Sequence, residues 1–236
     1  MTDVKSNLNL IKERIENASL KAGRSKDSVK LIAVSKFHPV EDMINCIESG
    51  HSVFGENRVQ EAKQKYEYLK KNGYSFTLHI IGTLQRNKVK DAVRIADCIQ
   101  SVDRLEVLDE IEKQCAKLEK KIDILIEVHT GEESKSGFEQ GQDLDKAVRN
   151  CAESVYPHVN LKGFMTMAPD TKDESLIRAS FKTLRDIKEK YSSIYSHMNL
   201  TELSMGMSGD YESAIEEGST MVRVGTAIFG ERDYSK

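Results

Sequence analysis

The sequence contains only three prolines, Pro39, Pro157 and Pro169, and they are far apart. It has no proline-rich linker, no low-complexity segment and no short-period repeat. No segment therefore marks a boundary between domains, and 236 residues are ample for one large domain with a hydrophobic core. We expect a single domain over residues 1–236, in which residues 1–25 form an N-terminal cap helix.

Cysteine is also sparse. Cys46, Cys98, Cys115 and Cys151 are widely spaced, and no two of them form a Cys-x-x-Cys pair. This spacing offers neither a disulfide framework nor a zinc knuckle, so we expect reduced thiols. The six histidines show no His-x-x-x-His or other ligand spacing, and we predict no metal site.

Long apolar runs and an excess of one charge are missing as well. No run approaches the ~20 apolar residues of a membrane span, and the N-terminal residues lack the apolar core of a signal peptide. The formal net charge is −3. In the stretch 61–71 lysines such as Lys63 and Lys65 interleave with Glu61 and Glu67, which is typical of a solvated helix face. We expect a cytoplasmic protein that binds neither nucleic acid nor membranes.

The sequence is instead dominated by a regular alternation. Short apolar, β-branched runs alternate with charged stretches of helical period, starting with a helix whose apolar face holds Leu8, Ile11, Ile15 and Ala18. Strands are expected at 31–36, 52–57, 76–82, 98–103, 122–130, 159–167, 200–206 and 221–230, with a helix after each of the first seven. This order predicts parallel βαβ units. Eight of them in about 200 residues predict an α/β fold, a TIM-type (β/α)8 barrel. The main alternative is an open doubly wound sheet.

The first expected strand ends in a lysine. The run LIAVSK, residues 31–36, places Lys36 where the chain leaves the strand. Barrels of this type carry their sites at the carboxyl ends of the strands. A lysine in an apolar mouth has a lowered pKa, and its amine can attack carbonyl groups to form a Schiff base.

The last two strands are followed by groups that suit an anion. Ser208, Gly209 and Asp210 stand at the start of an expected helix, where backbone N–H groups are exposed. In the stretch VRVGTAIFG of the last strand region, Gly225 offers close backbone approach and Thr226 offers a hydroxyl. Because barrels frequently bind phosphate with the loops after strands 7 and 8, these residues together with Lys36 suggest an aldehyde that carries a phosphate.

Seven stretches in order along nearly the whole chain carry a resemblance to a known family: LIAVSK, FGENRVQE, HIIGTLQRNK, GEESKSGF, GFMTMAP, LSMGMSGDYESAI and GSTMVRVGTAIFGERDYS. The sequence resembles the pyridoxal phosphate homeostasis proteins, which are similar to the barrel domain of alanine racemase. The resemblance implies that Lys36 carries pyridoxal 5'-phosphate (PLP) as a Schiff base, that Ser208, Gly225 and Thr226 hold the phosphate, and that Arg223 approaches the pyridine nitrogen. It also implies a monomer.

An arginine beside the pyridine nitrogen would disfavour ring protonation, because arginine is always cationic. That choice argues against aminotransferase-like chemistry and fits a racemase-like site or a carrier. We also place Asn57 and His79 among the cofactor-binding candidates, Asn57 at the end of the second strand and His79 within the third. Softer candidates for the mouth are Glu56, Gln85, Asn87, Lys135 and Ser136; Met165, Met167, Met205 and Met207 are expected to line the pocket and core.

Two positions depart from the family pattern that we recognise. His129 stands where an asparagine is common, and Thr83 replaces a more usual proline or histidine. Neither position belongs to the lysine or phosphate motifs. They leave the polarity of the rim, and any preference for a small molecule, open.

Two classes of function compete on this evidence. The first is a PLP-binding protein of vitamin B6 and amino-acid homeostasis that acts as a carrier or regulator, with PLP-requiring apo-enzymes as partners. The second is a PLP-dependent racemase, which needs an acid or base on each face of the substrate carbon. The chain ends at Lys236 without the β-rich second domain of alanine racemases, so we expect a carrier without robust catalysis. A cofactor-free Schiff-base aldolase is a third reading that the ordered motifs disfavour.

Overall fold

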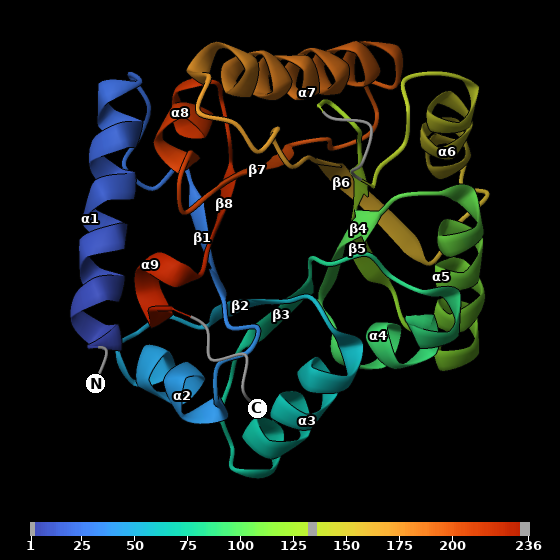
Figure 1. The fold of residues 1–236 in the computed structure, drawn as a ribbon. Helices are drawn as coiled ribbons and strands as arrows, with labels where there is room; N and C mark the ends of the chain where they lie inside the picture. The colour runs from blue at the N-terminus through green and yellow to red at the C-terminus, as the bar shows by residue number, and fades with distance from the viewer. Residues whose placement is uncertain (1–2, 132–135, 232–236) are drawn as a thin grey trace.

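A computed structural model describes residues 3–131 and 136–231. In this part of the chain eight parallel strands close into a barrel in sequence order (Figure 1). The strands are Lys30–Val34 (β1), Val53–Glu56 (β2), Thr77–Ile80 (β3), Cys98–Val102 (β4), Ile122–Glu127 (β5), Val159–Met165 (β6), Glu202–Met207 (β7) and Met221–Val224 (β8). Because β8 pairs with β1 and closes the sheet, the barrel prediction is confirmed and the open sheet is excluded.

Helices surround the barrel on all sides (Figure 1). They are Val4–Lys21 (α1), Val40–Glu48 (α2), Val59–Lys71 (α3), Val89–Ile95 (α4), Leu105–Leu118 (α5), Gln142–Ala152 (α6), Glu174–Ile194 (α7), Tyr211–Glu216 (α8) and Thr226–Phe229 (α9), with a 3₁₀ turn at Arg86–Lys88 (η1). The first helix precedes every strand and packs against α8 and α9. Its buried face includes the four residues expected from the sequence, Leu8, Ile11, Ile15 and Ala18.

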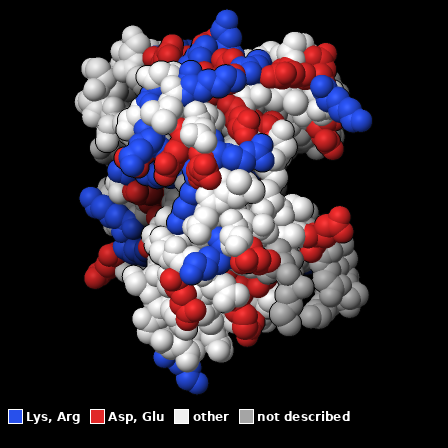
Figure 2. Space-filling view, turned by 90° about the vertical axis from the view of Figure 1, so that its left-hand side faces the viewer, with Lys and Arg blue, Asp and Glu red and all other residues white. Residues whose placement is uncertain are grey.

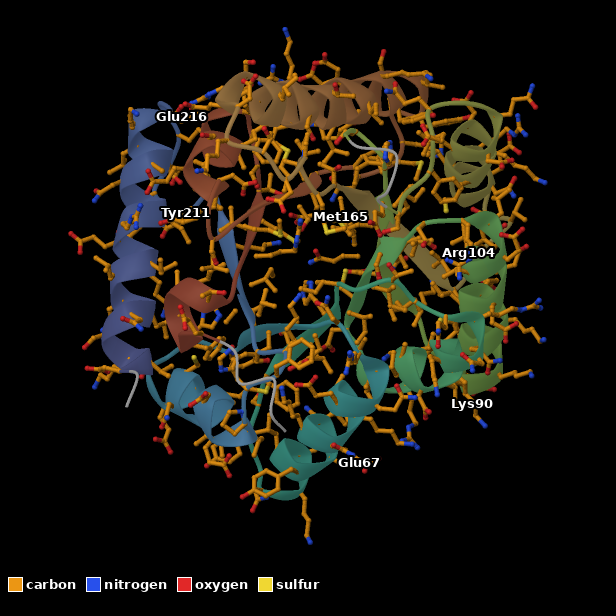
Figure 3. All side chains as sticks on the ribbon, in the orientation of Figure 1. Glu67, Lys90, Arg104, Met165, Tyr211 and Glu216 are labelled. Atoms are coloured by element: carbon orange, nitrogen blue, oxygen red, sulfur yellow. The ribbon has the colours of Figure 1, made fainter. Side chains whose placement is uncertain are left out.

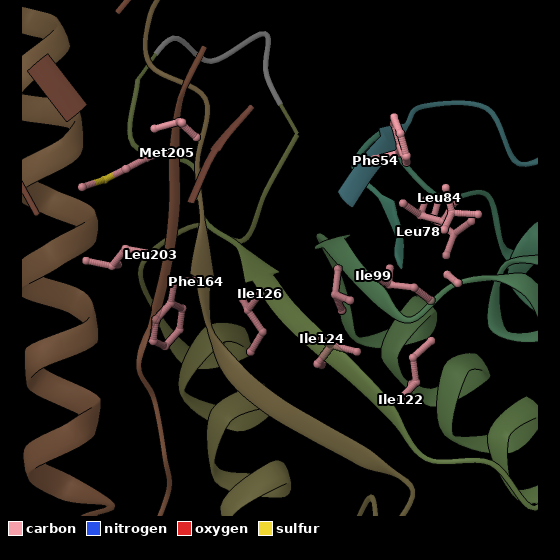
Figure 4. Close-up of a cluster of buried hydrophobic side chains, with 14 of the residues drawn as sticks. Phe54, Leu78, Leu84, Ile99, Ile122, Ile124, Ile126, Phe164, Leu203 and Met205 are labelled. Atoms are coloured by element: carbon pink, nitrogen blue, oxygen red, sulfur yellow. The ribbon is translucent and has the colours of Figure 1, made fainter. Parts of the chain in front are cut away.

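The main core lies between the outer surface of the barrel and the helices. Phe54, Leu78, Ile99, Ile124 and Phe164 come from successive strands and are almost completely buried there (Figure 4). Each such side chain contributes about 1.5–3 kcal/mol through burial. A continuous layer of this kind holds the strand ends, and therefore the loops that follow them, in fixed positions.

A second, smaller cluster fills the inside of the barrel. It consists of Ile32, Cys98, Leu125, Met165 and Met221, and Met165 lies near the centre of the view down the barrel (Figure 3). Polar side chains share this interior: His79, Gln100, Ser204 and Arg223 are all buried. Burying polar groups is costly unless they are hydrogen-bonded, so their partners matter for the site.

The expected last strand, 221–230, is too long and is wrong beyond Val224. The strand stops there, and Gly225 accepts hydrogen bonds from the N–H groups of Ile228 and Phe229 at 2.8 and 3.0 Å, which makes the helical turn α9. The apolar run that looked like a strand buries Ile228 and Phe229, in an element that packs against α1. The turn brings Thr226 to the rim of the barrel.

Acidic and basic side chains alternate over the visible face that contains α1, without a large area of one sign (Figure 2). The same view shows the molecule in profile, hollowed along the edge that forms the front of Figure 1. Within the described residues, no helix combines the length and apolar character that crossing a membrane would require.

Candidate functional site

Lys36 lies at the carboxyl-terminal rim of the barrel. Strand β1 ends at Val34, and Lys36 follows two residues later with a half-buried side chain. The next residue, Phe37, has a positive φ of 65°, which is uncommon outside glycine. The chain therefore turns sharply at Lys36, and such a turn needs support from its surroundings.

That support comes from a buried ion cluster formed by Glu56, Glu61 and Lys65. The ammonium of Lys65 donates at 2.7 Å to Glu56 Oε1, to Glu61 Oε1 and to the backbone carbonyl of Ser35. Glu61 Oε1 also accepts the backbone N–H of Phe37 at 2.7 Å. The residues on both sides of Lys36 are thus fixed by the same cluster.

Glu56 and Lys65 are buried, and Glu61 is partly exposed. Glu56 is fully buried, and Ser35 Oγ donates to its Oε1 at 2.7 Å. Burial raises the pKa of the Glu56 carboxyl, and the nearby Lys65 cation opposes that rise. Lys65 was expected on a solvated helix face, but only 8% of it is exposed, so that expectation is wrong. Its long side chain reaches under the rim, which the alternation of charges in α3 did not reveal.

The loops after β7 and β8 meet beside this turn. Ala33 of β1 pairs with Val224 of β8, so Gly225 follows directly alongside the end of β1. A Cβ atom at Gly225 would come within 3.1 Å of the Val34 carbonyl oxygen. The Gly225 N–H donates to Ser208 Oγ at 3.4 Å, which joins the two loops.

Backbone donors are available in the same place. Thr226 and Ala227 begin α9, and their N–H groups make no backbone hydrogen bond within the described residues. Such groups at the start of a helix need an outside acceptor. Ser208 is half-buried and Thr226 is exposed, so two hydroxyls accompany these N–H groups at the rim.

Arg223 lies one step deeper in the barrel. Only 4% of it is exposed, and its guanidinium donates to Ser204 Oγ at 2.7 Å and to the Thr166 carbonyl at 2.8 Å. In the described part of the chain no carboxylate lies within 4.0 Å of it, so a simple ion pair does not account for this arginine. Burial lowers its pKa to about 10, with Glu127 and Asp210 acting in the opposite direction. The rim therefore contains a buried cation whose charge is not neutralised by a contacting acid.

The structure does not bring His79 to this rim. His79 follows Thr77 and Leu78 in β3, and its Nδ1 lies 2.7 Å from Gln100 Nε2 inside the barrel. Its ring lines a cavity at the amino-terminal ends of the strands. As a cofactor-binding candidate His79 therefore lies away from Lys36, because its side chain bonds Gln100 in the interior and lines the cavity at the opposite end of the barrel.

Asn57, in contrast, lies at the rim. It follows β2 directly, and its side-chain Oδ1 is buried without a hydrogen-bond partner among the described residues. Gly82, after β3, lies so close that a Cβ there would come within 2.7 Å of the Asn57 backbone. An orphaned acceptor at this place is a candidate contact for a ligand group that carries a proton.

The softer candidates are spread around the rim. Ser136 donates to the largely buried Glu127 at 2.6 Å and accepts from Thr83 at 3.4 Å. Gln85 and Asn87 are exposed. His129 lies 3.4 Å from Glu139, whereas Lys135 falls outside the described residues. Met165 and Met205 are buried, Met167 is half-buried and Met207 is exposed.

Sequence reasoning missed the residues that support the site from below. These are Glu61 and Lys65 under Lys36, and Gln100 and Ser204 under Arg223. For the first pair a signal existed, since Glu61 and Lys65 are four residues apart and face each other on one helix. For Gln100 and Ser204 the only signal was a polar residue inside an otherwise apolar strand.

Comparison with known proteins gives the family. The family model for the N-terminal domain of alanine racemase matches residues 6–233. A pyridoxal phosphate homeostasis protein of Pasteurella multocida is 38% identical over 236 residues, which cover 99% of each chain. The solved structure of PipY from Synechococcus elongatus with PLP bound is 34% identical, with a TM-score of 0.81 over 93% of this chain and 100% of that one.

A more distant likeness concerns the fold alone. An alanine racemase of Clostridium difficile is 16% identical, with a TM-score of 0.73; the likeness covers 97% of this chain and 56% of the racemase. The closed eight-stranded barrel with its preceding helix is thus the alanine racemase barrel. With identities well above 30% over nearly its full length, the chain belongs to the pyridoxal phosphate homeostasis protein family.

Proposed function

We propose that this chain binds PLP covalently, as a Schiff base on Lys36, and acts as a carrier or regulator in PLP and amino-acid homeostasis. The observation that carries the proposal is the turn at Lys36, fixed on both sides by the Glu56–Glu61–Lys65 cluster and adjacent to the loop at Gly225. When bound, PLP supplies an aldehyde and an electron-withdrawing ring. The name and bound cofactor of the relatives support this assignment.

The residues at the rim fit a phosphate ester. Phosphate oxygens are acceptors, and the N–H groups of Thr226 and Ala227 lack backbone partners within the described residues. Ser208 adds a hydroxyl beside them, and the missing side chain of Gly225 lets this loop lie against Val34 of β1. Donors of this kind bind phosphate without requiring a lysine. In this proposal the phosphate does not need Lys36, which instead bonds to the aldehyde.

Arg223 fits the ring nitrogen of the cofactor. Its cation is buried, and its two described contacts are neutral acceptors, a serine hydroxyl and a backbone carbonyl. A guanidinium beside the pyridine nitrogen keeps that nitrogen unprotonated, which weakens the ring as an electron sink. This arrangement favours holding the cofactor over carbanion chemistry.

An amino-acid racemase is the alternative, supported by the shared barrel. Racemisation by two bases needs a proton donor and a proton acceptor on opposite faces of the substrate carbon. The described residues flanking Lys36 use their polar groups inside the Glu56–Glu61–Lys65 cluster, and none of them supplies an obvious second base. The carrier is therefore the better-supported function.

Borohydride trapping tests the cofactor and its site. The protein is incubated with PLP, reduced, digested and analysed by peptide mass spectrometry, with Lys36→Ala and Lys63→Ala treated in parallel. We expect a pyridoxyl mass on the peptide that contains Lys36 in the wild type and in Lys63→Ala, and none at this position in Lys36→Ala. A wild-type protein without the adduct at Lys36 would contradict the proposal.

A second assay separates the carrier from the racemase. Loaded protein is mixed with an apo-enzyme that requires PLP, and the rate of its activation is compared with the rate of spontaneous PLP release. A carrier activates the apo-enzyme faster than release alone allows. Release-limited activation, together with stereochemical inversion of an amino acid that depends on Lys36, would favour the racemase.

A further inference from the structure

The amino-terminal end of the barrel, opposite Lys36, contains a cavity of about 460 Å³. Each of the eight strands contributes to it, seven of them from their first or second residue and β6 with Lys162, its fourth residue. The floor of the cavity is apolar and also contains His79, and its outer edge is charged: the charged residues are Lys30, Asp97, Asp123, Lys162 and Glu202. Its volume lies within the range of small-molecule pockets, roughly 300–1,000 Å³.

A chain of hydrogen bonds fixes which nitrogen of His79 carries the proton. Arg223 can only donate, so the Ser204 hydroxyl accepts from it and donates to Gln100 Oε1 at 2.7 Å. Gln100 must then turn its amide nitrogen toward His79, whose Nδ1 accepts at 2.7 Å. The proton of the neutral imidazole is therefore on Nε2.

Nε2–H is a donor without a protein partner beside the cavity. His79 is only 7% exposed as a residue and lines the cavity, and Nε2 makes no hydrogen bond to any residue that the structure describes. Nε2 is not among the fully buried atoms that lack a partner, so a molecule in the cavity can reach it. Burial lowers the pKa of His79 to about 4, which keeps the ring neutral. A donor that lines a cavity without a protein partner is matched by a ligand that brings an acceptor.

The charged edge of this cavity favours a ligand with a positive charge. Glu202 is paired with Lys30 at 2.7 Å, and Asp123 lies 3.9 Å from Lys162. The third carboxylate, Asp97, accepts the backbone N–H of Leu78. No cation within the described residues lies within 4.0 Å of it, although Lys120 interacts with it at longer range while donating to the carbonyls of Val93 and Ala96. The helices return to this end of the barrel, and their carboxyl-terminal ends carry partial negative charge.

From these contacts we propose that the cavity at the amino-terminal end is a second binding site, which takes a small organic cation bearing an oxygen acceptor. The acceptor receives the Nε2–H of His79, and the cation faces Asp97. The apolar floor, with Ile32 and Leu125, accommodates the carbon atoms between these two groups.

The site is connected to the opposite end of the barrel. Three hydrogen bonds lead from His79 through Gln100 and Ser204 to Arg223. This connection rests on the proposed function, in which Arg223 approaches the cofactor ring. A ligand that binds His79 polarises the chain and thereby changes the donor strength of Arg223 toward the ring.

The binding test uses 2-(dimethylamino)ethanol, a tertiary amine that cannot condense with an aldehyde. Its binding is followed by the NMR resonances of the His79 imidazole in the full chain carrying Lys36→Ala, without PLP. We expect saturable shifts with a Kd on the order of millimolar, as suits a ligand of so few atoms. The acceptor-free ethyldimethylamine and the uncharged 2-methoxyethanol are expected to bind at least about fivefold more weakly.

Two substitutions test the contacts. Asp97→Asn keeps an acceptor for Leu78 but removes the charge, and we expect it to raise the Kd of the probe about fivefold or more. His79→Phe removes the Nε2–H donor from the floor of the cavity. Because this variant lacks the imidazole, binding of the probe is followed through the NMR resonances of residues at the edge of the cavity. Equal affinity for the uncharged analogue, or an unchanged Kd in Asp97→Asn, would overturn the site.

The coupling is tested separately in wild-type protein loaded with PLP. The probe should shift the absorption band of the bound cofactor, whereas Gln100→Met, which interrupts the chain at similar volume, should bind the probe without the shift. A shift that persists in Gln100→Met would refute the coupling and leave the site standing. A missing cofactor band before addition of the probe would count against the proposed function only.

Discussion

Replacing Lys65 by methionine is the perturbation for which the structure gives the largest expected effect near Lys36. The substitution keeps much of the side-chain volume and removes the charge that holds Glu56, Glu61 and the Ser35 carbonyl, each at 2.7 Å. Removing one partner of a buried ion pair costs about 3–5 kcal/mol, because the other charge remains buried and uncompensated. We expect a loss of unfolding free energy in that range, measured by equilibrium urea unfolding.

The loss should depend on pH. Burial raises the pKa of Glu56 in the folded state, and without Lys65 that pKa rises further. The folded variant then holds a proton that the unfolded chain releases, so its stability is greatest at acidic pH and falls as pH rises through the pKa of Glu56 in the folded variant. The difference from the wild type should therefore be smaller at about pH 5 than at about pH 8.

Two controls sharpen this prediction. Lys63→Met, on the same helix, removes a half-exposed pair with Asp91 at 3.2 Å and should cost less than about 1 kcal/mol. Adding Glu56→Gln to Lys65→Met should recover part of the loss, since no buried charge is then left alone. A cost of Lys65→Met no larger than that of Lys63→Met, or a double variant no more stable than the single one, would refute the reasoning.

The same variant should also impair the function. Ser35 and Phe37 lose their anchors when the cluster is broken, so Lys36 is held less firmly. We expect slower accumulation of the borohydride-trapped adduct in folded Lys65→Met than in Lys63→Met. Equal trapping rates in the two folded variants would show that the cluster stabilises the fold without positioning the lysine.

Three further outcomes follow from the geometry. Ser208→Ala should raise the Kd for PLP about tenfold or more, measured by fluorescence titration, because a hydrogen bond to a charged group contributes about 1.5–3 kcal/mol; an unchanged Kd would remove Ser208 from the phosphate site. The wild type should lose stability as pH falls from about 6.5 to about 4, by as much as about 3 kcal/mol for His79, since the unfolded chain takes up the proton more readily. His79→Phe should lack this part of the loss, and identical pH profiles in urea unfolding would contradict it. Gly163→Ala should largely prevent folding because its Cβ would lie 1.9 Å from the Glu202 carbonyl oxygen, whereas Gly141→Ala meets no atom within 4 Å and should be nearly neutral in the yield of folded protein.

The alternation of strands and helices could be predicted from the sequence because the pattern that produces it is local. Each buried strand is a short run of β-branched residues, and each helix repeats its apolar positions every three to four residues. The end of β8 could not be predicted from the local pattern, since Ile228 and Phe229 suit a strand and a buried helical turn equally well. Their packing against α1, more than 200 residues away in the sequence, decides between the two.

In the candidate site, too, some features follow from local sequence and others depend on long-range contacts. Lys36, Ser208 and Gly225 follow strand ends, and the rule that strand ends share one rim is enough to bring them together. The support beneath them depends on reach: Lys65 extends from α3 to three oxygens of different elements, which no spacing rule encodes. His79 illustrates a further limit, because its position within the third strand predicts an inward-facing side chain but not its height in the barrel, and the structure places it beside the cavity at the opposite end.

Arg223 explains why the interior of this barrel is polar along one line. A guanidinium has only donors, so an arginine at the head of a hydrogen-bonded chain sets the direction of every bond that follows. Ser204 and Gln100 are able to donate onward because each accepts from the side of Arg223. A carboxylate in the same position would reverse all three bonds, place the proton of His79 on Nδ1 and leave an acceptor facing the cavity. In the proposed site, one residue thus determines both the electronic character offered to the cofactor ring and the hydrogen-bonding character of the cavity at the other end.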